Sequence, residues 1–385
     1  MRFALFTDTF TPQINGVART YQRLIAYLES KNVETRVFAP AGGLPENETE
    51  NPSVVRFFSC DFFLYPDCQF SLPNYFSAHH ILSEFQPDLI HLATPFMMGL
   101  TGLKYANDHH IPKVAVFHTN FPQYLEYYRL PWLKKLAWRF LRWFHQQAEK
   151  NYCPSQDTRK LLRRHGVNKL EIWTRGVDSG LFNPNRKSLE FRRQLGLEDK
   201  TVLLYVGRLA PEKSVEVLLK ALYAANSANK KLHLLIAGDG PSRAGLQQAA
   251  PPNVTFLGYK SGQELAGIYA TSDIFVCPSV TETFGNVILE AMASGLPVIA
   301  PLSGGIKENL FPAKNGLSCL PLNPLSMSGA ILEMAADTML RQQLADQAYA
   351  HAKRQSWDEV FYRLLSSYLE VVEAYNFRKK MFQAI

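Results

Sequence analysis

Two cations, Arg208 and Lys213, lie five residues apart in a segment that directly follows the apolar run 201–206. An arginine guanidinium binds phosphate oxygens in pairs through its planar fork, and a lysine ammonium acts as a compact point charge. The two side chains could therefore clamp a diphosphate at the end of a strand. A solvated basic loop would have the same composition, and the residues alone leave both interpretations open.

A second group of polar residues lies within the segment 278–295. Its pattern predicts the end of a strand, a loop and then a helix that ends at Gly295. The main-chain N–H groups of Phe284, Gly285 and Asn286 would lie where this helix begins. The helix dipole would help such groups to hold a phosphate.

Two carboxylates accompany these N–H groups. Glu290 falls inside an otherwise apolar helical run, where a carboxylate is costly unless it has a partner. Glu290 and the loop residue Glu282 could accept hydrogen bonds from ribose and sugar hydroxyls. Helix capping and plain surface exposure are the simpler explanations for the same two residues.

In the first half of the chain, Gly16 and His118 also follow strand-like runs. Gly16 belongs to an Asn-Gly turn, where a residue without a side chain lets a ligand approach the main chain, although an ordinary tight turn has the same sequence. His118 ends the run 114–118. Histidines at such positions are more often structural, so His118 gains weight only beside the other residues at strand ends.

Other motifs give weaker or negative signals. Gly238-x-Gly240 resembles the start of a dinucleotide fingerprint, but Arg243 stands where the third glycine would be. The chain contains no P-loop sequence. It also contains no Asp-x-Asp, which removes one common arrangement for Mg²⁺ or Mn²⁺ held by carboxylates.

The segment 127–144, here called the basic-aromatic segment, combines cations with aromatic and apolar residues. No acidic residue lies between Glu126 and Glu149. Such a composition on a helix suits an anionic membrane interface. RNA binding, or a core helix with a basic outer face, would use the same residues. The cations are Arg129, Lys134, Lys135, Arg139 and Arg142.

The overall composition excludes several classes of protein. Of the 385 residues 46% are hydrophobic, and 22 glycines and 23 prolines are an ordinary share, so the chain is neither collagen-like nor disordered. Five widely spread cysteines favour a reducing cytoplasm over a disulfide scaffold. No run approaches 18 apolar residues, so no span of a bilayer is expected. The formal charge of +7 favours anionic partners without choosing among them.

Short apolar runs alternate with helical patterns in both halves of the chain, which predicts an α/β fold of two doubly wound parallel sheets. Turn residues near 176–190 suggest a linker between the halves. Ligands of such sheets bind beyond the carboxyl ends of the strands. Strands are expected at 2–8, 33–39, 88–92, 114–118, 201–206, 232–237, 254–257, 274–277 and 298–300, and helices at 18–29, 102–106, 215–225 and 357–375.

Taken together, these motifs resemble those of the retaining, nucleotide-sugar-dependent glycosyltransferases of family 4, which have the GT-B fold. The resemblance covers nearly the whole chain. Asp8-Thr9-Phe10 and the run 173–184 are most similar to GDP-mannose-dependent α-mannosyltransferases and sulfoquinovosyl-diacylglycerol synthases. The motifs are Asn15-Gly16-Val17, Pro87-Asp88-Leu89-Ile90-His91, His118-Thr119, Gly207-Arg208 with Lys213, Gly238-Asp239-Gly240-Pro241, and the segment from Glu282 to Glu290.

This resemblance implies two Rossmann-like domains that face each other across a cleft. The acceptor-binding domain would span 1–178, the nucleotide-sugar-binding domain 179–355, and a final helix at 356–385 would cross back to the first domain. The implied catalytic residues are His118, Arg208, Lys213 and Glu282, and the implied donor-binding residues are Gly16, Phe284, Gly285, Asn286 and Glu290.

The same resemblance implies the chemistry. Arg208 and Lys213 would stabilise the departing nucleotide diphosphate, and His118 would lie beside the transferred sugar. Retention of the anomeric configuration is expected, and neither a metal nor another cofactor is expected.

The expected function is the transfer of a hexose from GDP-mannose or a UDP-sugar to a membrane lipid, such as a diacylglycerol-based glycolipid. The protein would be cytoplasmic, would bind the anionic inner membrane face through 127–144, and would not bind nucleic acid. A soluble or polysaccharide-precursor acceptor is the alternative.

Overall fold

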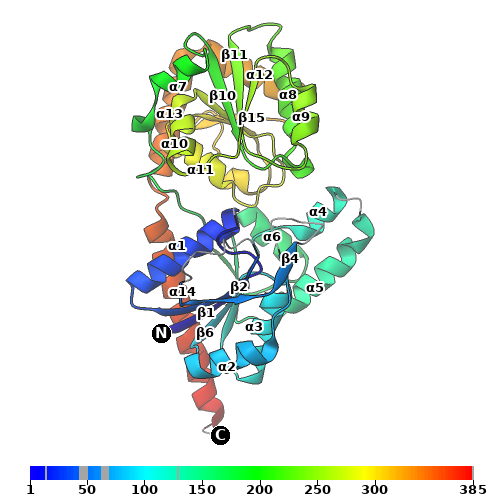
Figure 1. The fold of residues 1–385 in the computed structure, drawn as a ribbon, viewed down its shortest axis with the longest axis vertical. Helices are drawn as coiled ribbons and strands as arrows, with labels where there is room; N and C mark the ends of the chain where they lie inside the picture. The colour runs from blue at the N-terminus through cyan, green and yellow to red at the C-terminus, as the bar shows by residue number, and fades with distance from the viewer. Residues whose placement is uncertain (14, 43–50, 62–68, 128–129, 384–385) are drawn as a thin grey trace. The chain divides into compact units, whose positions relative to one another are not determined.

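The computed structural model describes residues 1–13, 15–42, 51–61, 69–127 and 130–383. The chain forms two compact units, each of which is a sheet covered by helices (Figure 1). Unit 1 comprises Met1–Pro154, Thr158–Trp173 and Asp358–Ile385, and unit 2 comprises Ser155–Asp157 and Thr174–Trp357.

Unit 1 is built on a parallel sheet whose central strands are buried. Nearly every residue of β1 (Arg2–Phe6), β6 (Leu89–Leu92) and β7 (Lys113–Val116) is shielded from solvent, as expected for a parallel sheet with helices on both faces. Beside it lies a small antiparallel pair, β4 (Ser59–Asp61) and β5 (Gln69–Ser71). The order of the seven strands described is β3 (Val54–Phe57), β2 (Glu34–Pro40), β1 (Arg2–Phe6), β6 (Leu89–Leu92), β7 (Lys113–Val116), β8 (Lys150–Cys153) and β9 (Leu170–Ile172).

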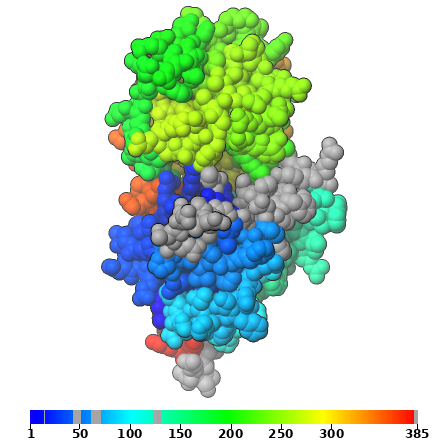
Figure 2. Space-filling view, viewed as in Figure 1, coloured from blue at the N-terminus to red at the C-terminus, as the bar shows by residue number. Residues whose placement is uncertain are grey.

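The helices of unit 1 bury one face each. In α1 (Gly16–Ser30), the residues Leu24, Ile25 and Leu28 recur at helical spacing and are all buried. α2 (Tyr75–Phe85) lies at the surface, with only Ala78 and Leu82 buried (Figure 2). The helices are α1 (Gly16–Ser30), α2 (Tyr75–Phe85), α3 (Met97–Asp108), α4 (Phe121–Tyr127), α5 (Lys134–Gln146), α6 (Gln156–Arg164), most of which lies in this unit, and α14 (Trp357–Gln383), of which all but Trp357 lies in it.

Unit 2 repeats the same topology. Its six described strands are all parallel, and they pair in the order β12 (Val254–Gly258), β11 (Leu232–Ala237), β10 (Thr201–Val206), β13 (Ile274–Val276), β14 (Val298–Pro301) and β15 (Gly316–Cys319). Its helices are α7 (Leu189–Gln194), α8 (Val215–Ala225), α9 (Arg243–Ala249), α10 (Gly262–Thr271), α11 (Asn286–Ala293), α12 (Pro324–Ala336) and α13 (Thr338–Ala352).

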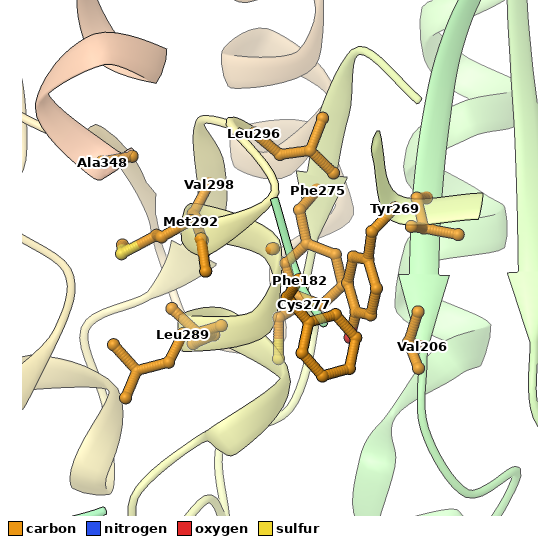
Figure 3. Close-up of a cluster of buried hydrophobic side chains, with 14 of the residues drawn as sticks. Phe182, Val206, Tyr269, Phe275, Cys277, Leu289, Met292, Leu296, Val298 and Ala348 are labelled. Atoms are coloured by element: carbon orange, nitrogen blue, oxygen red, sulfur yellow. The ribbon is translucent and has the colours of Figure 1, made fainter. Parts of the chain in front are cut away.

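One core of unit 2 lies beneath α11. Tyr269 and Phe182 meet edge to face with ring centroids 5.6 Å apart, and Phe275, Leu289 and Met292 complete the packing (Figure 3). Such aromatic geometry adds to the burial of apolar area. The core therefore fixes α11, the helix that carries Glu290.

In both sheets the strand order reverses beside the first strand of the unit. β1 lies between β2 and β6, and β10 lies between β11 and β13. Ligands of doubly wound sheets bind outside the carboxyl ends of the strands at this switch point. The prediction of two doubly wound α/β sheets is confirmed, and the loops after β10 and β13 lie where a ligand of unit 2 is expected.

The basic-aromatic segment is not the single helix that its composition suggested. α4 ends at Tyr127, a 3₁₀ turn covers Pro131–Leu133 and α5 begins at Lys134. Proline lacks the N–H that a helix interior needs, so it fits here only at the start of the turn. Arg129 lies outside the described residues.

Candidate active site

The loop after β10 is shaped by the loop after β11. A Cβ atom at Gly238 would come within 1.9 Å of the carbonyl oxygen of Gly207, and a Cβ atom at Gly240 within 2.4 Å of that of Leu209. Ser242 N donates a hydrogen bond to Leu209 O at 2.8 Å. Gly238-x-Gly240 therefore serves the close approach of two backbones and needs no dinucleotide to explain it.

Arg208 and Lys213 each face a carboxylate. Lys213 Nζ lies 2.6 Å from Glu282 Oε1, and Arg208 Nη1 lies 4.0 Å from Glu212 Oε1. All four side chains are less than a fifth exposed, so their charges are less screened than charges at the surface. The two predicted phosphate-binding cations thus lie in a partly desolvated site where carboxylates oppose them.

Glu212 is the most deeply buried of these four groups. It is 1% exposed, and its Oε2 has no hydrogen-bond partner among the described residues. Buried polar atoms without partners are costly and require an explanation, which a functional site can give. The sequence gives no sign of this burial, because a glutamate after Pro211 in a loop is typical of a solvated position. The main chain of Glu212 is tied to the loop after β13, because Thr281 Oγ1 donates to Glu212 O at 3.0 Å.

The loop after β13 is anchored by the segment that follows β14. Ser303 Oγ donates to Val280 O at 2.8 Å, and Gly305 N donates to Glu282 O at 2.7 Å. A Cβ atom at Gly304 would lie only 2.4 Å from Glu282 O. Ser303-Gly304-Gly305 therefore fixes the main chain that carries Glu282. Two adjacent glycines shortly after the apolar run 298–300 are the only trace of this support in the sequence.

The start of α11 combines a glycine turn with an unsatisfied acceptor. Gly285 adopts a φ of 84°, which favours glycine, and α11 begins at Asn286. Asn286 Oδ1 is buried and has no hydrogen-bond partner within the part of the chain that the structure describes. The Phe284 side chain lies in the core, so only its main chain can meet a ligand.

Glu290 has the partner that its position in an apolar helix requires. Tyr269 donates a hydrogen bond from its hydroxyl to Glu290 Oε2 at 3.1 Å. Glu290 is half-buried, and its Oε2 faces the hydroxyl of Tyr269. This contact ties the carboxylate to Tyr269, which belongs to the core shown in Figure 3.

Cys277 lies next to these groups, but its thiol is unreactive. Burial, followed by the negative charge of Glu282, raises the pKa of the Cys277 thiol to about 12. A protonated thiol is a poor nucleophile. The site therefore offers cations, carboxylates and main-chain groups for binding, with no thiolate from Cys277 at neutral pH.

In unit 1, Gly16 is the first residue of α1 and not the centre of a turn. Asn15 Oδ1 caps the helix by accepting from Val17 N at 3.0 Å and Ala18 N at 2.9 Å. Asn15 Nδ2 donates to Thr9 Oγ1 at 2.6 Å, which ties the start of the helix to the loop after β1. Gly16 is exposed, so its main chain is accessible to a ligand.

His118 follows β7, which ends two residues earlier than predicted, at Val116. The imidazole is 8% exposed, and its Nε2 lies 2.6 Å from the hydroxyl of Tyr21. Trp173 packs edge-on against the same ring, with centroids 5.6 Å apart. Gly16 and His118 thus lie in unit 1, and the other predicted site residues lie in unit 2.

Asp8 lies beside the switch point of unit 1. Its carboxylate accepts hydrogen bonds from Thr94 Oγ1 at 2.5 Å and from Met98 N at 3.1 Å, so it caps α3. Burial raises the pKa of Asp8 to about 6, although these hydrogen bonds act in the opposite direction. The pair of contacts indicates a structural role.

The outer surface of α5 carries both cations and apolar groups. Trp138, Leu141 and Phe144 face the core. The opposite surface, here called the α5 face, exposes Lys135, Leu136, Arg139, Arg142 and Trp143. The segment therefore includes core residues as well as an amphipathic surface.

Two possible features are absent from the described ranges. None of the helices placed there combines the length and the apolar character that crossing a bilayer requires. Nor do three or more His, Cys, Asp or Glu side chains gather there in a way that could hold a metal ion.

Two doubly wound parallel sheets are the architecture of the GT-B fold, and solved structures share it. Sucrose-phosphate synthase of Thermosynechococcus elongatus matches with a TM-score of 0.80 and 20% identity, over 97% of this chain and 100% of that chain. HepE of Anabaena, solved with UDP and glucose, matches with a TM-score of 0.75 and 20% identity, over 96% of this chain and 99% of that chain.

Relatives and family models agree with the fold. Residues 14–181 match the model "Glycosyltransferase Family 4", and residues 200–337 match "Glycosyl transferases group 1". A GDP-mannose-dependent alpha-mannosyltransferase of Mycobacterium tuberculosis is 34% identical over 96% of each chain. A sulfoquinovosyl transferase of Arabidopsis thaliana is 32% identical over 92% of this chain and 71% of that protein. An alpha-monoglucosyldiacylglycerol synthase of Streptococcus pneumoniae is 30% identical over 99% and 88%, respectively.

The chain therefore belongs to glycosyltransferase family 4. The predicted resemblance to this family, including its mannosyltransferase and sulfoquinovosyl subgroups, is confirmed.

Proposed function

We propose that this glycosyltransferase moves a hexose from a nucleotide sugar, GDP-mannose or a UDP-sugar, to a membrane lipid with retention of the anomeric configuration. The observation that carries the donor part is the two partly buried ion pairs, Arg208 with Glu212 and Lys213 with Glu282, in the loops after β10 and β13 at the switch point of unit 2. GDP-mannose is the donor in the name of the mycobacterial relative, and diacylglycerol is part of the name of the pneumococcal relative.

Donor binding begins with an exchange of partners at Lys213. Without donor, Lys213 is neutralised by Glu282 at 2.6 Å. A diphosphate carries more negative charge than one carboxylate, so it draws the ammonium away from Glu282. Glu282 is then released to accept hydrogen bonds from hexose hydroxyls, and recognition of the phosphate is coupled to recognition of the sugar.

The remaining donor contacts come from α11 and α1. Main-chain N–H groups at Phe284, Gly285 and Asn286 meet the phosphate or the sugar, and the buried Asn286 Oδ1 accepts from a donor hydroxyl. Glu290, held by Tyr269, accepts hydrogen bonds from the ribose. Gly16 offers its main chain to the diphosphate.

The two cations act most strongly as the glycosidic bond breaks. Negative charge then develops on the leaving diphosphate, and fixed cations in a partly desolvated site stabilise it without reorganisation. Arg208 and Lys213 fill the role that a divalent metal fills in other sites, so the proposed reaction needs no metal. His118 contacts the transferred sugar, and the acceptor attacks from the face that the leaving phosphate occupies.

The acceptor part rests on the α5 face and on the pneumococcal relative. Exposed Arg139 and Arg142 beside exposed Trp143 suit the boundary between anionic headgroups and acyl chains. The protein would then act as a peripheral protein at the cytoplasmic face of a membrane.

A thermal-shift series against UDP-, GDP- and ADP-sugars tests the donor part. A ligand that binds only the native state raises the unfolding temperature with its concentration. We expect one nucleotide sugar to stabilise the protein, and we expect Arg208→Ala to remove most of the shift. The matched control Arg354→Ala, at an exposed position of unit 2, should keep it. No shift with any of the three nucleotides would refute the proposed donor site.

A further inference from the structure

A chain of hydrogen bonds lies behind His118. The Tyr21 hydroxyl lies 2.6 Å from His118 Nε2 and 2.8 Å from His91 Nε2, and the Tyr368 hydroxyl lies 2.7 Å from His91 Nδ1. Tyr21, His91 and Tyr368 are wholly buried. No solvent therefore interrupts the chain between its two ends.

The four residues come from separate parts of unit 1. Tyr21 belongs to α1, His91 to β6, His118 to the loop after β7 and Tyr368 to α14. Their rings also pack on one another, with centroids of Tyr21 and His91 5.3 Å apart and those of His91 and Tyr368 5.7 Å apart. Phe3 stacks on Tyr368 at 5.4 Å. This packing fixes the rings, and the hydrogen bonds then fix where the protons lie.

His91 carries a single proton in the folded protein. Burial lowers the pKa of His91 to about 3, so the imidazole is neutral at physiological pH. A neutral imidazole donates from one nitrogen and accepts at the other. Because both nitrogens of His91 are engaged by tyrosine hydroxyls, the direction of one hydrogen bond sets the direction of the other.

Two continuous proton orders are possible along the chain. In the first, Tyr368 donates to His91 Nδ1, His91 Nε2–H donates to Tyr21, and Tyr21 donates to His118 Nε2. In the second, every donor becomes an acceptor. A phenol is the stronger acid and an imidazole nitrogen the stronger base, so a phenol donates to imidazole more favourably than the reverse. The first order contains two such bonds and the second contains one.

We propose that Tyr21, His91 and Tyr368 are positioning residues that hold His118 as its Nδ1–H tautomer. His118 Nε2 then accepts from Tyr21, and Nδ1, the nitrogen on the other side of the ring, carries the proton. His118 therefore acts toward the sugar as a hydrogen-bond donor and not as a base. This inference rests on the proposed function only in that His118 must contact the donor sugar.

Tautomers of histidine can be measured directly by ¹⁵N NMR of the imidazole nitrogens, with His118 assigned by the signals that His118→Ala lacks. We expect His118 in the native protein to be the Nδ1–H form. Tyr368→Phe removes only the hydroxyl at the far end of the chain from His118, and we expect it to raise the fraction of the Nε2–H form. A native His118 in the Nε2–H form would overturn the proposal whether or not any variant folds.

Tyr152→Phe is the matched control. Its hydroxyl is also buried and also bonds to α14, at 2.8 Å from Ser367 Oγ, but it lies outside the chain. We expect Tyr152→Phe to leave the tautomer of His118 unchanged. An equal response to Tyr152→Phe and Tyr368→Phe would indicate a general loosening of α14 and would overturn the specific role of the chain.

Kinetics supply an independent readout. We expect Tyr21→Phe and Tyr368→Phe to lower kcat about tenfold with little change in the KM of the donor. The reason is that the tautomer of His118 affects the transition state of sugar transfer, in which charge develops, and not the binding of the donor. A native kcat in both variants, with an altered tautomer, would show that His118 does not contact the reacting sugar. That result contradicts the proposed role of His118 in catalysis while supporting the hydrogen-bonded chain.

Discussion

Lys213 has a carboxylate partner at 2.6 Å, and the proposed binding of a donor requires Lys213 to exchange that partner for a phosphate. The ion pair is mostly buried, with side-chain exposures of 19% for Lys213 and 16% for Glu282. If either partner is truncated, the other charge stays desolvated without a partner. Truncation of either residue is therefore expected to destabilise the site. Within the ion pair, the positive charge of Lys213 and the negative charge of Glu282 offset each other.

Lys213→Ala tests this exchange. We expect kcat for sugar transfer to fall by about 100-fold or more, because a preorganised cation no longer faces the leaving diphosphate. Steady-state transfer with labelled donor measures the loss, and circular dichroism shows whether the fold is kept. Lys220→Ala changes an exposed lysine of α8 and should transfer sugar at the native rate. Near-native turnover of Lys213→Ala would remove Lys213 from the mechanism.

Individual residues were predictable from sequence where the local pattern itself was informative. An acidic residue inside an apolar helix pointed to a partnered Glu290, and Tyr269 provides the partner. Glu212 and Tyr21 gave no such signal, because a glutamate in a loop is typical of a solvated position and Tyr21 resembles any other aromatic residue on a helix face. Contacts between residues 70 or more positions apart, as between Tyr21 and His91, leave no trace in a local pattern.

Among the structural elements, strands with strongly apolar sequences were predicted closely. β10, β11 and α8 have the predicted bounds. The strands Lys150–Cys153 and Leu170–Ile172 were missed, because their sequences contain polar residues and they are recognised as strands only by pairing with β7 and with each other. Pairing between distant segments overrides weak local propensity.

The exposed face of α5 is expected to bind anionic membranes. Lys135, Arg139 and Arg142 lie on its exposed face, and each cation contributes about 1 kcal/mol of attraction near an anionic membrane. The triple change of these residues to glutamate should lower binding to phosphatidylglycerol vesicles at low salt by about 100-fold or more. Co-sedimentation with vesicles measures the bound fraction.

The control for this experiment has the same change in charge elsewhere. Lys220, Lys230 and Lys231 are exposed in unit 2, and their triple change to glutamate should leave most of the vesicle binding intact. Equal losses in the two triple variants would show that only net charge matters. A native protein that does not bind anionic vesicles even at low salt would refute the membrane part of the proposal.

Across the whole molecule, charge is unevenly distributed between the two halves of the chain. Residues 1–175 contain 20 Lys and Arg against 15 Asp and Glu, a net charge of +5, which leaves +2 of the total +7 for the remainder. The excess thus lies mainly in the half that carries α5. Unit 1 also contains His91, His145 and Asp8, three buried groups with shifted pKa values.

The lowered pKa values of His91 and His145 predict that acid destabilises unit 1. Burial lowers the pKa of His91 to about 3 and that of His145 to about 4, whereas an unfolded histidine has a pKa near 6.5. Protons are therefore taken up on unfolding, and stability that is full above pH 6.5 is lost as the pH falls. From pH 7.5 to pH 5, each histidine should cost about 2 kcal/mol. Asp8, whose pKa is raised, opposes this loss between about pH 6 and pH 3.8.

Urea unfolding followed by tryptophan fluorescence measures this effect, since Trp132, Trp138, Trp143 and Trp173 lie in unit 1 and only Trp357 lies in unit 2. His145→Gln should reduce the loss between pH 7.5 and pH 5 by about 2 kcal/mol, whatever its effect at pH 7.5. An unchanged pH dependence in His145→Gln would show that His145 is protonated in the folded state.

The most direct test of the account is transfer of labelled sugar from GDP-mannose or UDP-hexoses to membrane lipids by the purified protein, with Lys213→Ala in parallel. We predict that one donor labels a lipid and that the new linkage keeps the α configuration of the donor. We also predict that the amount of product formed by Lys213→Ala is lower by about 100-fold or more. Label found only in soluble acceptors, an inverted linkage, or equal labelling by Lys213→Ala would contradict the account.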